Sequence, residues 1–283
     1  MSVANITNIK EAGFTATYTG LIACLAKCDQ MQLYPIINWY SHLYSNDKDE
    51  NIFYKYFELI NYANKPDIIT NTINMGTWEQ LSQPRMEWRK ILCAAYTNHV
   101  KLRPEFVTYI DNVFNKINNI PLIGVHIRNT DRAIEPAWAS PGITYVIDCL
   151  IKVLKEYNNT ETTIGLYIAS DNIPDVVLLK DTITKISNDL PTIIYIEDPK
   201  CVRSPDQTSV HGNLDSGLTT VSNDEKALSI LTDIYCLARC KKVVRTCSNV
   251  TSMVGIISPT TIFIDVSLEC GKQSDEWLQV QGI

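Results

Sequence analysis

The stretch GVHIRNTDR, residues 124–132, turns from an apolar strand into a cluster of charge that begins at Arg128. A guanidinium can hold a diphosphate through two parallel hydrogen bonds, which a lysine ammonium does less well. If the strand alternates regularly, His126 faces the same way as Arg128. We expect Arg128 either at a phosphate site or in an ion pair with Asp131, and His126 either beside that site or hydrogen-bonded in the core.

Two more groups of polar residues follow strand-like segments. Asp171 comes directly after TIGLYIAS, and Ser248 and Asn249 come shortly after VVRT. The carboxyl ends of parallel strands meet at one edge of a sheet, where α/β proteins bind nucleotides. A helix beginning near Ser248 would point backbone N–H groups at an anion, although Ser248 or Asn249 could instead simply cap that helix. The pattern predicts a nucleotide pocket, while the lack of GxGxxG after a strand and of GxxxxGK[ST] argues against an NAD site and a standard P-loop.

Glu135, shortly after Arg128, is the candidate general base. Inverting sugar transfer needs a carboxylate to take the proton of the acceptor hydroxyl, and cations or N–H dipoles to stabilise the leaving diphosphate. The alternative is that Glu135 is a solvated loop residue. The only Asp-x-Asp stretch, at residues 47–49, lies in the polar segment YSNDKDEN, so we interpret it as exposed surface and expect no metal requirement.

These residues need a parallel sheet to bring them together, and the chain after NNIP alternates between strand and helix patterns. Apolar segments predict strands at 122–128, 163–170, 192–198, 243–246 and 261–266. Helices are expected at 143–157, 174–189, 225–242 and 248–257. Such alternation predicts a doubly wound α/β domain, with the boundary between two domains near residues 118–121.

The first part of the chain has weaker patterns. A helix is expected over residues 15–29 after a turn at Gly13, followed by a strand that Pro35 interrupts. Residues 77–118 predict two helices, the second with Pro104 in its first turn. The C-terminal segment SDEWLQVQGI is expected to pack back across the first domain.

Composition restricts the function further. The 283 residues suit two domains, and 45% of them are apolar. A formal net charge of −6 disfavours a nucleic-acid partner, because duplex binding needs a broad basic surface. The sequence has no apolar run long enough to span a membrane and no secretory signal pattern, and its nine cysteines lie mostly in apolar segments. We expect a cytoplasmic protein with buried thiols.

Three segments together resemble the α1,6-fucosyltransferases, both the bacterial nodulation type and the animal N-glycan core type. HIRNTDR is similar to the family motif H-x-R-R-T-D-[KR], and LYIASDN to its strand followed by [ST]-D-[DN]. ILTDIYCLARCKKVVRTCSNVTSMV resembles its third motif, so the likeness covers about residues 104–265. The resemblance implies an α/β protein of the GT-B fold, in which two Rossmann-like domains face each other across a cleft. Residues 1–120 would form the acceptor-side domain and residues 121–283 the nucleotide-sugar-binding domain.

The resemblance also implies an inverting, metal-independent transferase that uses GDP-fucose, needs no cofactor and acts on a glycan acceptor. Arg128 matches the motif arginine that binds the donor phosphate, and Asp131 matches the aspartate that braces the motif arginines. Asp171 matches an acidic residue near the base and ribose, and Asp233 matches the aspartate of the helix in the third motif.

The remaining matches concern phosphate and catalysis. Ser248 and Asn249 match the pair that contacts phosphate, and Glu135 matches the catalytic glutamate if one residue is deleted just before it. Two positions depart from the family: Asn129 replaces the second motif arginine, and Val250 replaces a glutamine. Asn129 is neutral, so the identity of the donor is not fixed by the resemblance. Either Arg132, Arg203 or Arg245 supplies the missing charge, or the pocket binds a different nucleotide sugar.

Other functions remain in competition at this point. The same fold and reaction could use another donor such as UDP-xylose. A non-catalytic module that binds a nucleotide or a sugar would keep Arg128 but would not need Glu135. A Rossmann oxidoreductase or methyltransferase ranks third, because the glycine fingerprint is missing. The acceptor, the linkage and the oligomeric state cannot be predicted from these patterns.

Overall fold

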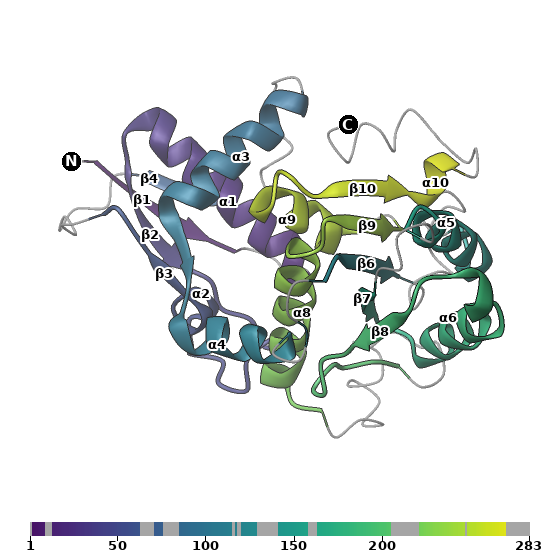
Figure 1. The fold of residues 1–283 in the computed structure, drawn as a ribbon. Coiled ribbons are helices and arrows are strands. Elements are labelled where there is room, and N and C mark those ends of the chain that lie inside the picture. Colours follow the sequence, from purple (N-terminus) through teal and green to yellow (C-terminus); the bar gives the residue numbers. More distant parts are fainter. Residues whose placement is uncertain are drawn as a thin grey trace.

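The computed structural model describes residues 2–8, 13–62, 71–75, 85–114, 117, 120–128, 141–157, 163–204, 221–246 and 248–269. Two parallel sheets lie on opposite sides of a central group of helices (Figure 1). The chain is α/β and has the two-sheet arrangement expected of GT-B. Within the described part of the chain, no helix is both long enough and apolar enough to cross a bilayer.

The larger sheet has five parallel strands in the order β10-β9-β6-β7-β8. Their bounds are β6 Leu122–Ile127, β7 Ile164–Ser170, β8 Ile193–Ile196, β9 Lys242–Arg245 and β10 Ile262–Asp265. All five strands predicted from the second part of the chain are confirmed. The apolar β6 lies at the centre, as its composition indicates, because a central parallel strand is covered on both faces.

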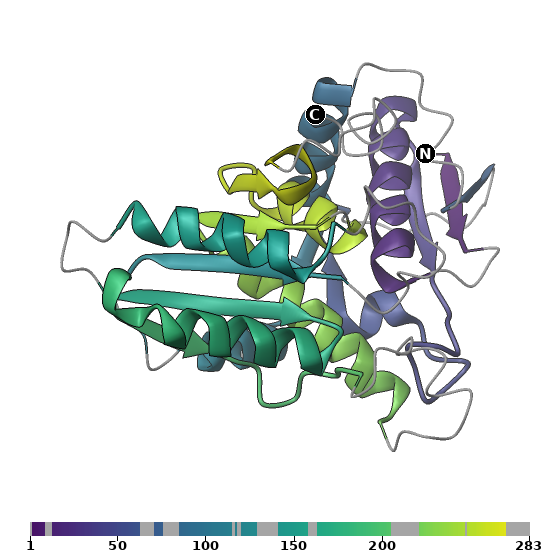
Figure 2. The same cartoon turned by 90° about the vertical axis from the view of Figure 1, so that its right-hand side faces the viewer.

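Helices cover both faces of this sheet. α5 (Ile143–Lys155) and α6 (Ile173–Lys185) lie side by side on one face, as Figure 2 shows, and their apolar residues form a core with alternate residues of β6 and β7. α8 (Asn223–Ala238) and α9 (Asn249–Ile257) cover the other face. The short helices η3 (Ser187–Asp189) and α10 (Val266–Glu269) complete this part. These helices confirm the predicted ones, although α8 ends at Ala238 and not at residue 242.

The smaller sheet has three parallel strands in the order β2-β1-β4. β1 (Val3–Thr7) and β4 (Asn71–Asn74) were missed by the sequence analysis, and β2 is Tyr34–Asn38. Pro35 does not interrupt β2, because β2 is an edge strand and needs ladder hydrogen bonds on one side only. α1 (Phe14–Met31) connects β1 to β2 and confirms the predicted helix.

The remaining elements of the first part lie between the two sheets or beside the smaller one. A short antiparallel pair joins β3 (Phe57–Leu59) to β5 (Val100–Leu102), and α2 (Ile52–Tyr56) precedes β3. α3 (Arg85–His99) and α4 (Pro104–Val113) are the two helices predicted within 77–118, and Pro104 does stand in the first turn of α4.

The two parts of the chain share one core. α8 and α9 pack against α1 and α3, and one hydrophobic cluster contains residues of all four helices. A row of tyrosine hydroxyls crosses this junction, with Tyr235 3.2 Å from Tyr18 and 3.0 Å from Tyr96. The domain boundary near residue 120 stays a prediction, and the C-terminal segment predicted to pack back lies outside the described residues.

Five of the seven described cysteines are buried as expected, whereas Cys93 and Cys201 are half-buried. No disulfide joins the cysteines at positions 24, 28, 93, 149, 201, 236 and 240. Burial raises the pKa of the Cys24 and Cys28 thiols to about 12, so both stay protonated. Cys247 and Cys270 lie outside the described residues.

Candidate active site

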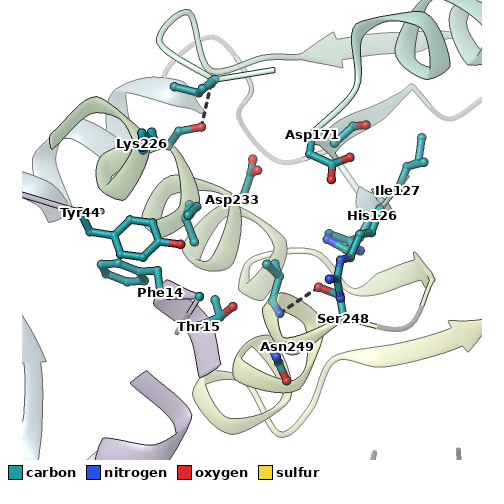
Figure 3. A pocket seen from close by; sticks show the side chains of 17 residues that line it. Phe14, Thr15, Tyr44, His126, Ile127, Asp171, Lys226, Asp233, Ser248 and Asn249 are labelled. Atoms are coloured by element: carbon teal, nitrogen blue, oxygen red, sulfur yellow. Dashed lines mark hydrogen bonds between the residues drawn. The ribbon is translucent and has the colours of Figure 1, made fainter. Parts of the chain in front are cut away.

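A cavity of about 190 Å³ opens between the carboxyl ends of β6, β7 and β9 on one side and α1, α8 and the loop after β2 on the other (Figure 3). We call its two sides the strand-end wall and the assembled wall. The strand-end wall is formed by His126, Arg128, Asp171, Ser248 and Asn249. The assembled wall is formed by Phe14, Thr15, Tyr44 and Lys226. Asp233 of α8 lies between the two walls in this view.

The strand-end wall is built by the register of the parallel sheet. The backbone N–H of Arg128 donates to Thr246 Oγ1 at 3.1 Å, and the N–H of Thr246 donates to the His126 carbonyl at 3.2 Å. These bonds keep β6 paired to the chain after β9 until both leave the sheet. Arg128 and the first turn of α9 therefore face the same cavity.

The imidazole ring of His126 lines the cavity and is neutral. Its side chain is 5% exposed, and Nδ1 has no hydrogen-bond partner among the residues that the structure describes. Burial lowers the pKa of His126 to about 3, and the nearby charges of Arg128 and Arg245 act in the same direction. A neutral imidazole can donate or accept a hydrogen bond, so His126 is suited to hold a polar group of a ligand.

Two helix N-termini point at the cavity. In α9, Ser248 is the N-cap and its Oγ accepts from the Val250 N–H at 3.1 Å. The second N-terminus belongs to α1, where Gly13 is the N-cap and supplies no capping side chain, and Phe14 and Thr15 line the cavity. Unpaired N–H groups and the helix dipole make such ends favourable for anions. Only the end of α9 was predicted from the sequence.

Asp233 has an unusual environment for a carboxylate. Tyr167 Oη donates to Asp233 Oδ1 at 2.7 Å. Burial raises the pKa of Asp233 to about 7, and the charges of Asp198 and Asp171 add to that rise, while the Tyr167 hydrogen bond and the charge of Arg203 oppose it. Asp233 can therefore change its protonation when a ligand enters.

Arg203 and Arg245 are the described arginines that could replace the charge missing at Asn129. Neither of them lines the cavity. Arg245 is 4% exposed, lies 3.3 Å from Asp265 and stacks on the ring of Phe263. Arg203 donates from Nη2 to the Ile168 carbonyl at 2.9 Å. Arg128 is consequently the arginine that the described chain brings to the cavity.

No known family and no curated protein matches the sequence. The structure is similar to fucosyltransferase NodZ from Bradyrhizobium (14% identity, 92% of this chain, 94% of that one, TM-score 0.54). It is also similar to NodZ α1,6-fucosyltransferase soaked with GDP-fucose (15% identity, 92% of this chain, 94% of that one, TM-score 0.54). A third similar structure is POFUT1 in complex with GDP (8% identity, 92% of this chain, 98% of that one, TM-score 0.54).

The chain has a fucosyltransferase-like GT-B fold. At these identities the likeness concerns the fold alone. The predicted fold class is confirmed, and it was reached from the order of strands and helices together with three short motifs.

The structure brings most of the predicted site residues together. His126, Arg128, Asp171, Asp233, Ser248 and Asn249 all line the same cavity. Asn129, Asp131 and Glu135 lie outside the described residues, as does Arg132. The roles of all these residues remain predictions, since lining a cavity does not establish a function.

The assembled wall was not predicted from the sequence. Phe14 and Thr15 were assigned only to a helix and its preceding turn, Tyr44 to no element, and Lys226 only to a helix. One available signal was the spacing of Lys226, Ile230 and Asp233, because residues four and three apart lie on the same face of a helix.

The Asp-x-Asp stretch does not line the cavity. Asp47 and Asp49 are exposed, as predicted, and the Asp49 N–H donates to Asp47 Oδ1 at 2.9 Å within the turn. Within the described ranges, no three His, Cys, Asp or Glu side chains come together as metal ligands would. Metal independence itself stays a prediction.

Proposed function

We propose that this chain is an inverting glycosyltransferase that moves a sugar from a nucleotide-diphosphate donor, GDP-fucose, to a glycan hydroxyl. The observation that supports it best is the convergence of Arg128 and of the N-termini of α1 and α9 on one cavity. A guanidinium and two sets of backbone N–H groups suit the negative charge of a diphosphate.

The reaction follows from this arrangement. As the bond between the sugar and the diphosphate breaks, negative charge builds up on the diphosphate. Arg128 and the N–H groups of the two helices would stabilise that charge more in the transition state than in the ground state. Glu135 would take the proton of the acceptor hydroxyl, which attacks the sugar from the face opposite the leaving group and inverts its configuration.

The choice of GDP rests on two supports. One of the similar structures is a complex with GDP and another was soaked with GDP-fucose, which concerns those proteins. In this chain, the carboxylates of Asp171 and Asp233 line the cavity as hydrogen-bond acceptors. Guanine offers adjacent N–H donors to such acceptors, whereas uracil offers a single N–H donor.

A UDP-linked donor is the second candidate, because Val250 lines the cavity where the family has a glutamine. Asn129 also lacks the charge of the motif arginine. UDP-xylose would keep the same reaction and the same phosphate contacts. A binding module without turnover is the third candidate.

The deciding experiment compares binding with turnover. Calorimetry with GDP, UDP and ADP should show the tightest binding for GDP, and GDP release from GDP-fucose should be detected, at a slow rate without acceptor. Tighter binding of UDP would favour the second candidate, and binding without any release would favour the module. Failure of all three nucleotides to bind would contradict the proposed function.

A further inference from the structure

One face of α8 forms a continuous strip along the cavity. Lys226, Ser229, Ile230 and Asp233 are spaced three and four residues apart and all line it. Lys226 and Asp233 are therefore about 10 Å apart along the helix axis. In Figure 3, Lys226 and Tyr44 lie on one side of Asp233, whereas His126 and Ser248 lie on the other.

Lys226 lies on the side of the cavity opposite Arg128 and the N-terminus of α9. Its side chain is 3% exposed. An ammonium in such a place is stable only when oxygen acceptors surround it, and its three N–H donors let it bind a ligand oxygen in addition to a protein partner. The proposed diphosphate contacts do not use this group.

The first turn of α8 is held rigidly to the loop that carries Tyr44. Lys55 Nζ lies 2.7 Å from Asp224 Oδ1, and Asn46 Nδ2 donates to the other oxygen of that carboxylate at 3.2 Å. Asn223 Nδ2 donates to the His42 carbonyl at 2.7 Å. These bonds cross between the two parts of the chain and join the first turn of α8, which carries Lys226, to α2 and to the loop that carries Tyr44.

The same turn is also capped from within. Ser222 Oγ accepts from the Glu225 N–H at 3.2 Å, and Glu225 Oε2 accepts from the Ser222 N–H at 2.8 Å. On the cavity side, Phe14 contacts the ring of Tyr44 edge-on, with 5.4 Å between the centroids. A lysine on so well fixed a helix turn is preorganised, which lowers the entropic cost of binding a ligand.

We propose that Lys226 determines substrate specificity by donating a hydrogen bond to an oxygen acceptor of the bound substrate. This inference rests on the proposed function and concerns the part of the substrate beyond Asp233. The oxygen is either a carbonyl of the donor's base or a carboxylate of the acceptor glycan, because both present the acceptor that an ammonium needs. The position of Lys226 on α8 thus adds a contact that no motif of the sequence indicated.

The test uses Lys226→Met and Lys226→Arg, with Lys152→Met as the matched control. Lys152 lies on α5 with its side chain 68% exposed, away from the cavity. Binding of GDP or UDP, whichever the parent protein binds more tightly, is measured by calorimetry. Donor turnover is compared between methyl β-glucuronide and methyl β-glucoside as acceptors, and thermal unfolding of each variant checks the fold.

If the oxygen belongs to the base, Lys226→Met binds the nucleotide about 10- to 100-fold more weakly, as expected for a hydrogen bond to a charged group. If it belongs to the acceptor, nucleotide affinity is unchanged, the parent prefers the glucuronide and Lys226→Met loses that preference. In both cases Lys226→Arg restores a large part of the effect and Lys152→Met behaves as the parent.

Unchanged nucleotide affinity and unchanged acceptor preference in Lys226→Met would overturn the inference and leave the proposed function standing. The same holds if Lys226→Met only lowers the unfolding temperature, because Lys226 would then serve the fold alone. If the parent binds neither GDP nor UDP, the proposed function fails, and the inference fails with it.

Discussion

The two walls of the cavity are built in different ways. The strand-end wall comes from the ends of neighbouring strands in one parallel sheet, so a regular register is enough to place Arg128 beside Asp171. The assembled wall joins the start of α1, a loop after β2 and the first turn of α8. The first two contact each other within the first part of the chain, and contacts between the two parts bring α8 to them.

This difference decides what a sequence can reveal about each wall. Polar residues after apolar strands converge in any doubly wound sheet, because all carboxyl ends lie at the same edge. Lys226 and Tyr44 are far apart in the sequence, and their meeting depends on a salt bridge and on hydrogen bonds that no local pattern announces.

Glu135→Gln has the largest expected effect on turnover. It tests whether the general base lies in the segment that follows the strand-end wall. Glutamine keeps the size of glutamate but cannot accept the proton, so turnover should fall about 10²- to 10⁴-fold while nucleotide affinity stays normal. Steady-state kinetics and calorimetry measure the two quantities. If turnover persists, the base lies elsewhere, with Asp131 and the first part of the chain as the next candidates.

Gly20→Ala tests how the assembled wall depends on the packing of α1. A Cβ at Gly20 would lie 2.0 Å from the carbonyl oxygen of Met75, which is backbone and cannot turn aside. The free energy of unfolding, measured with urea, should drop by about 3 kcal/mol. Gly124→Ala in β6 is the control, because its nearest obstacle is a side-chain atom, Leu237 Cδ2 at 2.7 Å, and not backbone, so it should cost less. Equal losses would contradict this account.

Arg128→Ala tests the strand-end wall as the phosphate site. Loss of a charged hydrogen-bond donor should weaken binding of the nucleotide diphosphate by about 1.5–3 kcal/mol. Calorimetry measures this, with Arg239→Ala as the control, since Arg239 lies at the end of α8 and pairs with Asp111. An unchanged affinity in Arg128→Ala would remove that arginine from the phosphate role.

Asp233→Asn tests the carboxylate between the walls through pH. An ordinary aspartic acid loses its proton near pH 3.8, whereas Asp233 in the folded protein loses it near pH 7. Between these values the folded state binds more protons than the unfolded state, so this group makes stability fall as pH rises, by at most about 1.4 kcal/mol per pH unit. Above pH 7 the loss is complete.

Urea unfolding of the parent and of Asp233→Asn between pH 4 and 8 measures the difference, and the variant should show the shallower fall. Asp181→Asn on α6 is the control, because Asp181 is exposed. Parallel pH profiles of parent and Asp233→Asn would show that the carboxylate is not held in a protonated state.

Addition of EDTA should have the smallest effect on turnover. The Asp-x-Asp stretch is exposed and does not line the cavity, and the proposed diphosphate contacts come from Arg128 and helix ends. Turnover should therefore remain nearly unchanged when the chelator is added. If EDTA abolishes turnover and manganese restores it, a metal ion lies in the site and neutralises the charge of the diphosphate.

The sequence by itself determined the larger sheet and the residues at its strand ends. β6 and β7 are apolar because both their faces are covered, and this requirement is visible in the residues themselves. It did not determine the smaller sheet, whose strands β1 and β4 are short and include polar residues such as Asn5 and Thr72. Such segments become strands only when a neighbour pairs with them.

Tertiary structure alone decided the assembled wall. α8 follows the larger sheet in sequence but packs into a core shared with α1 and α3, and a polar cluster around Asp224 fixes its first turn. Helical periodicity shows that Lys226 and Asp233 share a face of α8, but it cannot show what that face meets. The side chains opposite it, Phe14 and Tyr44, come from a distant part of the chain, and only long-range packing and hydrogen bonding bring them there.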